Sequence, residues 1–129
     1  MAGSILERQL GELGERFGVV EQFRLPSGNL LVTVQAYPLP PGWSAERTVV
    51  RFLVPPAYPF AALDCFWADN YLRLANGAVP QNAGADNPVA DAGYAGLWFS
   101  WHLASPWDPN RDTLSSWMNT IGDRFRRPQ

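Results

Sequence analysis

The stretch LWFSWHLASPWDPNRDTLSSWMNTIGDRF, residues 97–125, contains two patterns that decide the fold. From residue 99 to residue 103, apolar and polar side chains alternate, which is typical of an extended segment with one face against a core. After a turn-rich interval, apolar residues recur at helical spacing, and Asp112 stands where an amino-terminal cap is expected. The second half therefore predicts an amphipathic helix, whose apolar face contains Leu114, Trp117, Met118, Ile121 and Phe125.

The start of the chain predicts a second amphipathic helix. Ser4 and Glu7 have the spacing of a capping box, and Gly18 is expected to end the helix. Its apolar face contains Leu6, Leu10, Leu13 and Phe17. At the other end of the chain, we expect the arginines at 124, 126 and 127 to form a solvated basic end of the last helix.

Four β-like runs lie between the helices, at residues 19–24, 30–37, 48–54 and 63–67, separated by turn-forming residues. They predict an antiparallel meander. Residues 68–96 show little periodicity, so they are either a long functional loop or contain an element that the pattern does not reveal. We therefore expect one α+β domain over residues 1–129, with an N-terminal helix, a four-stranded antiparallel meander, a long irregular active-site segment and a C-terminal helix.

The composition excludes several classes of function. A net charge of -2 gives no broad positive field for nucleic acid or membrane surfaces, so neither is expected as a partner. All ten basic residues are arginines, which excludes lysine Schiff-base chemistry and a P-loop lysine. One cysteine and one histidine argue against a metal centre, and no cofactor is expected. The acidic residues near the start and the lack of a long apolar run favour a cytoplasmic protein.

Several motifs occur in an order that resembles a known family. A YPF turn at residues 58–60 follows a strand, and WDP at 107–109 precedes the last helix, as in the ubiquitin-conjugating enzyme superfamily. The stretch 80–114, with LWFSWH at 97–102 and DTL at 112–114, is similar to its bacterial branch, prokaryotic family E. The resemblance spans nearly the whole chain and implies a ubiquitin-conjugating-like fold.

The resemblance also implies an activity and partners. Such a protein receives the carboxyl terminus of a ubiquitin-like protein from an adenylating activating enzyme and transfers it to an amine. A deconjugating metallopeptidase of the same operon is a further expected partner. Tyr58 and Pro59 lie in the region where ligases dock in the family, and together with Trp107 they are expected to bind a partner.

The chain departs from the family at the catalytic position. It has no His-Pro-Asn triplet, whose asparagine helps to hold the oxyanion in the classical enzymes. Counting back from Trp107 by the family's usual spacing places the nucleophile at about Phe99, beside Ser100. Cys65 lies far from that position and is expected to pack as a small apolar residue of a strand.

Ser100 and His102 are the predicted catalytic pair. Residues two apart in an extended segment point to the same side, so the imidazole has the position of a base for the serine hydroxyl. Acyl transfer to Ser100 gives an oxyester instead of a cysteine thioester. The alternative is a serine and a histidine that simply bond to loop backbone.

Four further residues are candidates for supporting roles. Asp108 and Asp112 either orient the imidazole or serve as turn and cap carboxylates. Asn82 and Asn87 either stabilise an oxyanion or shape turns.

Two other functions stay open at this point. The missing cysteine and triplet favour an inactive variant that binds a ubiquitin-like protein or scaffolds an active partner. A free-standing ligand-binding or hydrolase domain that uses Ser100 and His102 is the third reading.

Overall fold

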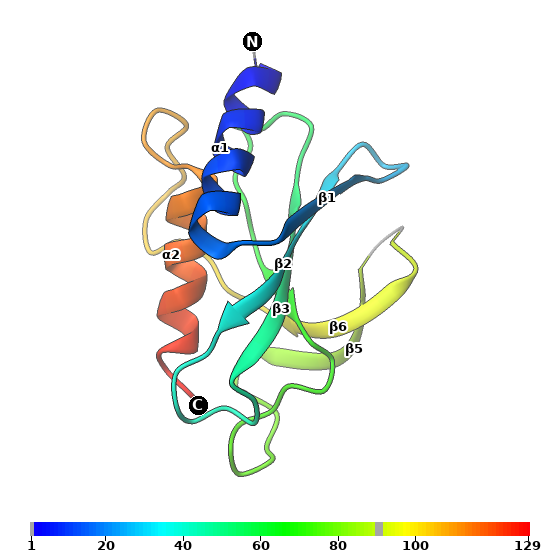
Figure 1. The fold of residues 1–129 in the computed structure, drawn as a ribbon, viewed down its shortest axis with the longest axis vertical. Helices are drawn as coiled ribbons and strands as arrows, with labels where there is room; N and C mark the ends of the chain where they lie inside the picture. The colour runs from blue at the N-terminus through cyan, green and yellow to red at the C-terminus, as the bar shows by residue number, and fades with distance from the viewer. Residues whose placement is uncertain (1, 90–91) are drawn as a thin grey trace.

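The fold is mixed α+β, with a helix at each end of an antiparallel sheet, as expected (Figure 1). The structure is a computed structural model that describes residues 2–89 and 92–129. Within these residues, no helix has the length and apolar character needed to cross a bilayer. The elements are α1 (Ala2–Phe17), β1 (Val20–Arg24), β2 (Leu30–Pro38), β3 (Arg47–Val54), β4 (Phe66–Ala68), β5 (Ala83–Val89), β6 (Tyr94–Phe99) and α2 (Leu114–Phe125).

The described sheet has six strands in the order β1-β2-β3-β4-β6-β5, with antiparallel pairing throughout. The first four strands form the predicted meander, but the fourth is a strand only from Phe66 to Ala68, so Cys65, expected within it, precedes it. The segment 68–96, expected to be irregular, instead provides β5 and the start of β6, which pair as a hairpin beside β4. The hydrophobic pattern of this segment does not reveal β5, because the strand lies at a sheet edge, is rich in small and polar residues, and contains Asp86 at φ 57.

Both helices pack against the same face of the sheet, and the core lies between the two layers (Figure 1). The five residues predicted to form the apolar face of α2 are each at most 1% exposed. Phe125 of this helix meets Phe66 and Phe99 of the neighbouring strands β4 and β6, with ring centroids 5.5 and 5.7 Å away. The helical spacing in the sequence therefore identified the core-facing side of α2 correctly.

The helix ends differ in detail from the prediction. Helix α1 begins at Ala2, so Ser4 falls inside it, and the side chain of Ser4 lies outside the described part of the chain. Gly18, at φ 86, ends α1 as expected. The cap of α2 is Thr113 and not Asp112, because the Thr113 hydroxyl accepts from the backbone N–H of Ser116 and the Ser116 hydroxyl accepts from that of Thr113.

Arg124 is not part of a solvated basic end, which corrects the prediction for this arginine. Its side chain is 2% exposed, and its guanidinium donates to the backbone carbonyls of Gln81, Arg127 and Gln129 at 2.7–2.9 Å. The guanidinium carbon also lies 5.2 Å from the ring centroid of Phe99. Burial lowers the pKa of Arg124 from its ordinary value, and the three main-chain oxygens and the aromatic ring stabilise the cation.

The contact between β4 and β6 depends on a residue without a side chain. Phe66 pairs with Phe99, and Ala68 pairs with Leu97. A Cβ at the adjacent Gly96 would lie only 2.8 Å from the backbone carbonyl oxygen of Ala68. Glycine at position 96 therefore lets the two strands come together.

Gly96→Ala is expected to lower the free energy of unfolding by ~1–3 kcal/mol, because the added methyl group forces β4 and β6 apart. Gly84→Ala in the same hairpin is the matched control, since a Cβ there meets nothing within 4 Å. Urea denaturation of both variants measures the difference. Equal stability of the two would show that the strands can separate at no cost.

Arg124→Leu is expected to lower the free energy of unfolding by ~2–4 kcal/mol, because three carbonyls lose their charged donor. Arg127→Leu, which changes an exposed side chain at the same helix end, should change stability by less than ~0.5 kcal/mol. Chemical denaturation measures the stability of both variants. A loss of stability in Arg124→Leu as small as that in Arg127→Leu would mean that the fold does not need the buried cation.

Candidate functional site

The backbone departs from regular sheet geometry immediately before β4. The Cys65 N–H donates to the carbonyl of Trp101 at 3.0 Å, which continues the pairing of β4 and β6 beyond their ends. Cys65 has φ 61, in the left-handed region that few residues other than glycine adopt. Such conformations persist only where the surrounding structure holds them, and they cluster at functional sites.

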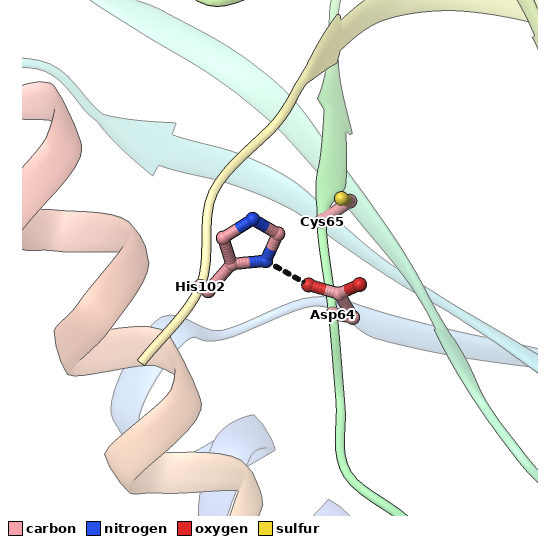
Figure 2. Close-up of side chains that lie close together, drawn as sticks. All are labelled: Asp64, Cys65 and His102. Atoms are coloured by element: carbon pink, nitrogen blue, oxygen red, sulfur yellow. Dashed lines mark hydrogen bonds and ion pairs between the residues drawn. The ribbon is translucent and has the colours of Figure 1, made fainter. Parts of the chain in front are cut away.

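Three reactive side chains meet at this point (Figure 2). Asp64 and Cys65 come from the segment that enters β4, and His102 comes from the segment that leaves β6. Nδ1 of His102 pairs with a carboxylate oxygen of Asp64, although the two residues are 38 positions apart. The Cys65 sulfur, a carboxylate oxygen of Asp64 and a ring nitrogen of His102 all lie within 4.8 Å of one another.

The Asp64–His102 pair gives each group a defined role. An ionised carboxylate has no proton to donate, so it accepts the hydrogen bond of Nδ1–H. In the neutral imidazole this leaves Nε2 of His102 as the basic nitrogen. Both side chains are open to solvent, with exposed fractions of 61% for Asp64 and 64% for His102. The arrangement matches a base that a carboxylate orients, beside a thiol.

The thiol itself is not ionised in this setting. Burial raises the pKa of Cys65 above its ordinary value, and the negative charge of Asp64 raises the pKa further. The thiol is therefore protonated at neutral pH and needs a base to become a nucleophile. The imidazole of His102 lies close enough to act as this base.

The site opens into a shallow groove of about 580 Å³. One wall is formed by residues 62–64 and the other by residues 102–107. Trp107 lies at the end of the second wall, and its indole N–H donates to the carbonyl of Pro59 at 2.7 Å. Asp64 and His102 both line this groove, so solvent reaches their side chains through it.

The burial around Ser100 follows the predicted alternation only at Phe99 and His102. Phe99 is fully buried, Ser100 and Trp101 are half-buried, and His102 is exposed. The backbone N–H of Ser100 donates to the carbonyl of Asn82 at 2.8 Å. The hydrogen-bond partner of His102 is Asp64, which the sequence reasoning had not considered.

The two predicted orienting acids hold a turn. The Asp112 carboxylate accepts from the backbone N–H of Asp108 at 2.8 Å, and the Asp108 carboxylate accepts from that of Asn110 at 2.9 Å. Asp112 also accepts from the Ser116 hydroxyl at 3.3 Å. These contacts correspond to the turn alternative for Asp108 and Asp112, since the cap of α2 is Thr113.

One of the two predicted asparagines precedes β5, and the other lies within it. Asn82 immediately precedes the strand at φ 58, beside Ser100. Asn87 lies within the strand, and its side-chain oxygen accepts from the indole N–H of Trp67 at 3.4 Å. The structure therefore brings Asn82, but not Asn87, into hydrogen-bond contact with Ser100 through the backbone.

The predicted partner-binding residues form one packed unit. Tyr58 is 3% exposed, its hydroxyl donates to the side chain of Gln9, and its ring lies 5.8 Å from that of Trp107. Pro59 is buried as well. The side chain that this turn presents to solvent is Phe60, which is 79% exposed.

The proximity of Cys65 and His102 has one signal in the sequence. Asp64 and Cys65 lie near the start of the apolar run at 63–67, His102 follows the run at 97–99, and antiparallel neighbours bring the start of one run beside the end of the other. Sequence reasoning did not predict that these two runs are neighbours, because the run at 97–99 was not recognised as part of the sheet.

Comparison with known proteins gives one match. A family model described as prokaryotic E2 family E matches residues 7–127. No curated protein and no solved structure matches the chain.

Cys65→Gly is expected to be more stable than Cys65→Ala by ~0.5–1 kcal/mol, because alanine keeps the cost of the left-handed conformation and glycine does not. Ala104→Gly, in the exposed wall of the groove, is the control and should lose stability in the usual way for glycine. Urea denaturation measures all three. A less stable Cys65→Gly would mean that the backbone at residue 65 is not held in the left-handed region.

Proposed function

Because the chain belongs to prokaryotic E2 family E, we propose that it carries a ubiquitin-like protein as an acyl group on Cys65. The carboxyl terminus of that protein comes from an adenylating activating enzyme and goes on to an amine. The observation that carries the choice of Cys65 is the Asp64–His102 pair within reach of its sulfur.

The first step moves the acyl group from the activating enzyme to this chain. As the Cys65 sulfur attacks the carbonyl carbon of the incoming thioester, its proton passes to Nε2 of His102. The bond between the carbonyl carbon and the activating enzyme's sulfur breaks, and that thiolate leaves. Asp64 holds the ring in position and stabilises the imidazolium that forms.

The second step releases the acyl group to an amine. The amine nitrogen attacks the carbonyl carbon of the Cys65 thioester, and an amide bond forms as the carbon–sulfur bond breaks. The Cys65 thiolate takes back a proton, and the amine gives up one to the solvent or to His102. Because the chain has no lysine, it offers no lysine amine that would compete as an acceptor.

Ser100 is the second candidate acceptor. It lies next to the position where the family's spacing places the nucleophile, and two residues before the exposed His102. The product on Ser100 is an oxyester, with His102 as the base and Asn82 as the adjacent oxyanion candidate. In this version Asp108 and Asp112 support the site indirectly, by holding the turn that follows Trp107, and Asn87 does so through its contact with Trp67.

An inactive variant is the alternative function, favoured by the missing His-Pro-Asn triplet and the protonated thiol. Such a chain binds the ubiquitin-like protein or supports an active partner without forming a covalent bond.

We assign the pathway to the cytoplasm, with a deconjugating metallopeptidase as a further component. In either version, the turn at Tyr58 and Pro59 with Trp107 supports a docking surface on which Phe60 is exposed.

The test is to incubate the chain with its activating enzyme, the ubiquitin-like protein and ATP, and to measure the intact mass. We expect an adduct that thiol cleaves, that Cys65→Ala abolishes and that Ser100→Ala retains. His102→Gln should slow adduct formation by at least ~100-fold, because it removes the base. Ser105→Ala, in the same groove, is the control and should leave the rate unchanged.

Two other outcomes overturn the assignment to Cys65. An adduct that resists thiol, is cleaved by hydroxylamine and disappears in Ser100→Ala would place the acceptor at Ser100. Tight binding of the ubiquitin-like protein with no adduct would favour the inactive variant.

A further inference from the structure

The side chains of Asp64, Cys65 and His102 offer a thiolate sulfur, an imidazole nitrogen and a carboxylate oxygen in one place. Zinc bonds to these three atom types are about 2.0–2.3 Å long, so tetrahedral ligand atoms lie about 3.3–3.8 Å apart. The three atoms already lie within 4.8 Å of one another. Asp64 and His102 are mostly exposed, so their side chains have room to rotate toward this geometry.

The backbone holds the two sides of this cluster together. The pairing of Phe66 with Phe99 and the hydrogen bond from Cys65 to Trp101 fix the distance between the segment of Asp64 and that of His102. The left-handed conformation of Cys65 places an irregularity at the entrance to β4, where two consecutive residues both contribute to the cluster. The site is therefore preformed by sheet pairing and does not need a loop to become ordered.

The donor set also indicates the kind of ion. Sulfur and imidazole ligands together suit borderline-soft ions such as Zn²⁺ and exclude a preference for Mg²⁺ or Ca²⁺, which take oxygen ligands. Three protein ligands leave a fourth position open, and two of the three, Asp64 and His102, line the groove. Counting each residue type alone argued against a metal centre, but the fold combines three different types.

We propose that Asp64, Cys65 and His102 form a binding site for a borderline-soft divalent transition-metal ion, with Zn²⁺ as the first candidate. The thiol proton is released to solvent when the sulfur binds the metal. The fourth position holds a water molecule or a group from a partner.

A bound ion has a consequence for the acyl carrier. The metal occupies the sulfur that would accept the acyl group, and it replaces the hydrogen bond between Asp64 and His102. Zn²⁺ binding therefore switches off acyl acceptance by Cys65. This consequence rests on the proposed function, whereas metal binding rests on the geometry alone.

Direct binding is tested by titrating the reduced full chain with Zn²⁺ in a calorimeter and with Co²⁺ in a spectrophotometer. We expect one ion per chain, a thiolate-to-cobalt charge-transfer band, and displacement of Co²⁺ by Zn²⁺. Cys65→Ala should abolish the band, and Asp64→Asn and His102→Gln should each weaken binding by at least ~10-fold. Ser105→Ala, which lines the same groove, should bind as the unchanged chain does.

Two results would overturn the metal site. One is an absence of the charge-transfer band in the reduced chain. The other is Zn²⁺ binding that Cys65→Ala leaves intact, because the ion would then sit elsewhere.

The inhibitory consequence needs a separate measurement. Adduct formation on this chain is compared with and without Zn²⁺ in the presence of Mg²⁺ and ATP, with the activating enzyme's own adduct as the control. We expect Zn²⁺ to suppress the adduct on this chain, and a chelator to restore it. If the ion binds and the adduct forms as before, the inhibitory consequence is wrong. If no adduct forms in any condition while Co²⁺ still gives its band, the proposed function fails and the metal site stands.

Discussion

The close approach of β4 and β6 is the constraint on which the site depends. It brings the chain that enters β4 beside the chain that leaves β6, and so places Asp64 and Cys65 next to His102. The approach is tight enough that residue 96 has no room for a Cβ against the backbone of Ala68. The placement of the reactive side chains therefore depends on close packing at Gly96, which lies at the other end of the β4–β6 pairing.

Large side chains with polar atoms hold the irregular segment after β6 against the rest of the molecule. The indole N–H of Trp101 donates to the carbonyl of Thr120 in α2 at 3.1 Å, and that of Trp107 donates to the carbonyl of Pro59. Arg124 contributes from the same helix by binding the carbonyl of Gln81, just before β5. His102 thus lies on a strand-like segment that α2 and the turn at Pro59 anchor at both ends, while its own ring stays open to solvent.

Local patterns predicted much of this fold, and contacts between distant segments account for what they missed. The helical stripes of α1 and α2 and the strand-like runs of β1–β3 depend on neighbouring residues, so the sequence shows them directly. Strand β5 pairs only with β6 and has an unusual backbone at Asp86, so its composition resembles that of a loop. Without that hairpin, the run containing Phe99 has no predicted place in the sheet, so the sequence points to the nearby acids and not to Asp64 as partners of His102. The buried cation of Arg124 was missed for the same reason, since its acceptors come from three separate backbone positions.

The irregularity of β5 has a consequence for how the molecules behave in concentrated solution. An outer strand with free donors and acceptors is a template on which strands of other molecules can add. In β5, Pro88 lacks an N–H, and the N–H of Asp86 is taken by the side chain of Asn70 at 2.7 Å. The amide of Asn70 also donates to the Asp86 carboxylate at 2.7 Å, which keeps a negative charge at this margin. The hairpin that completes the site is thereby a poor starting point for intermolecular sheet growth and aggregation.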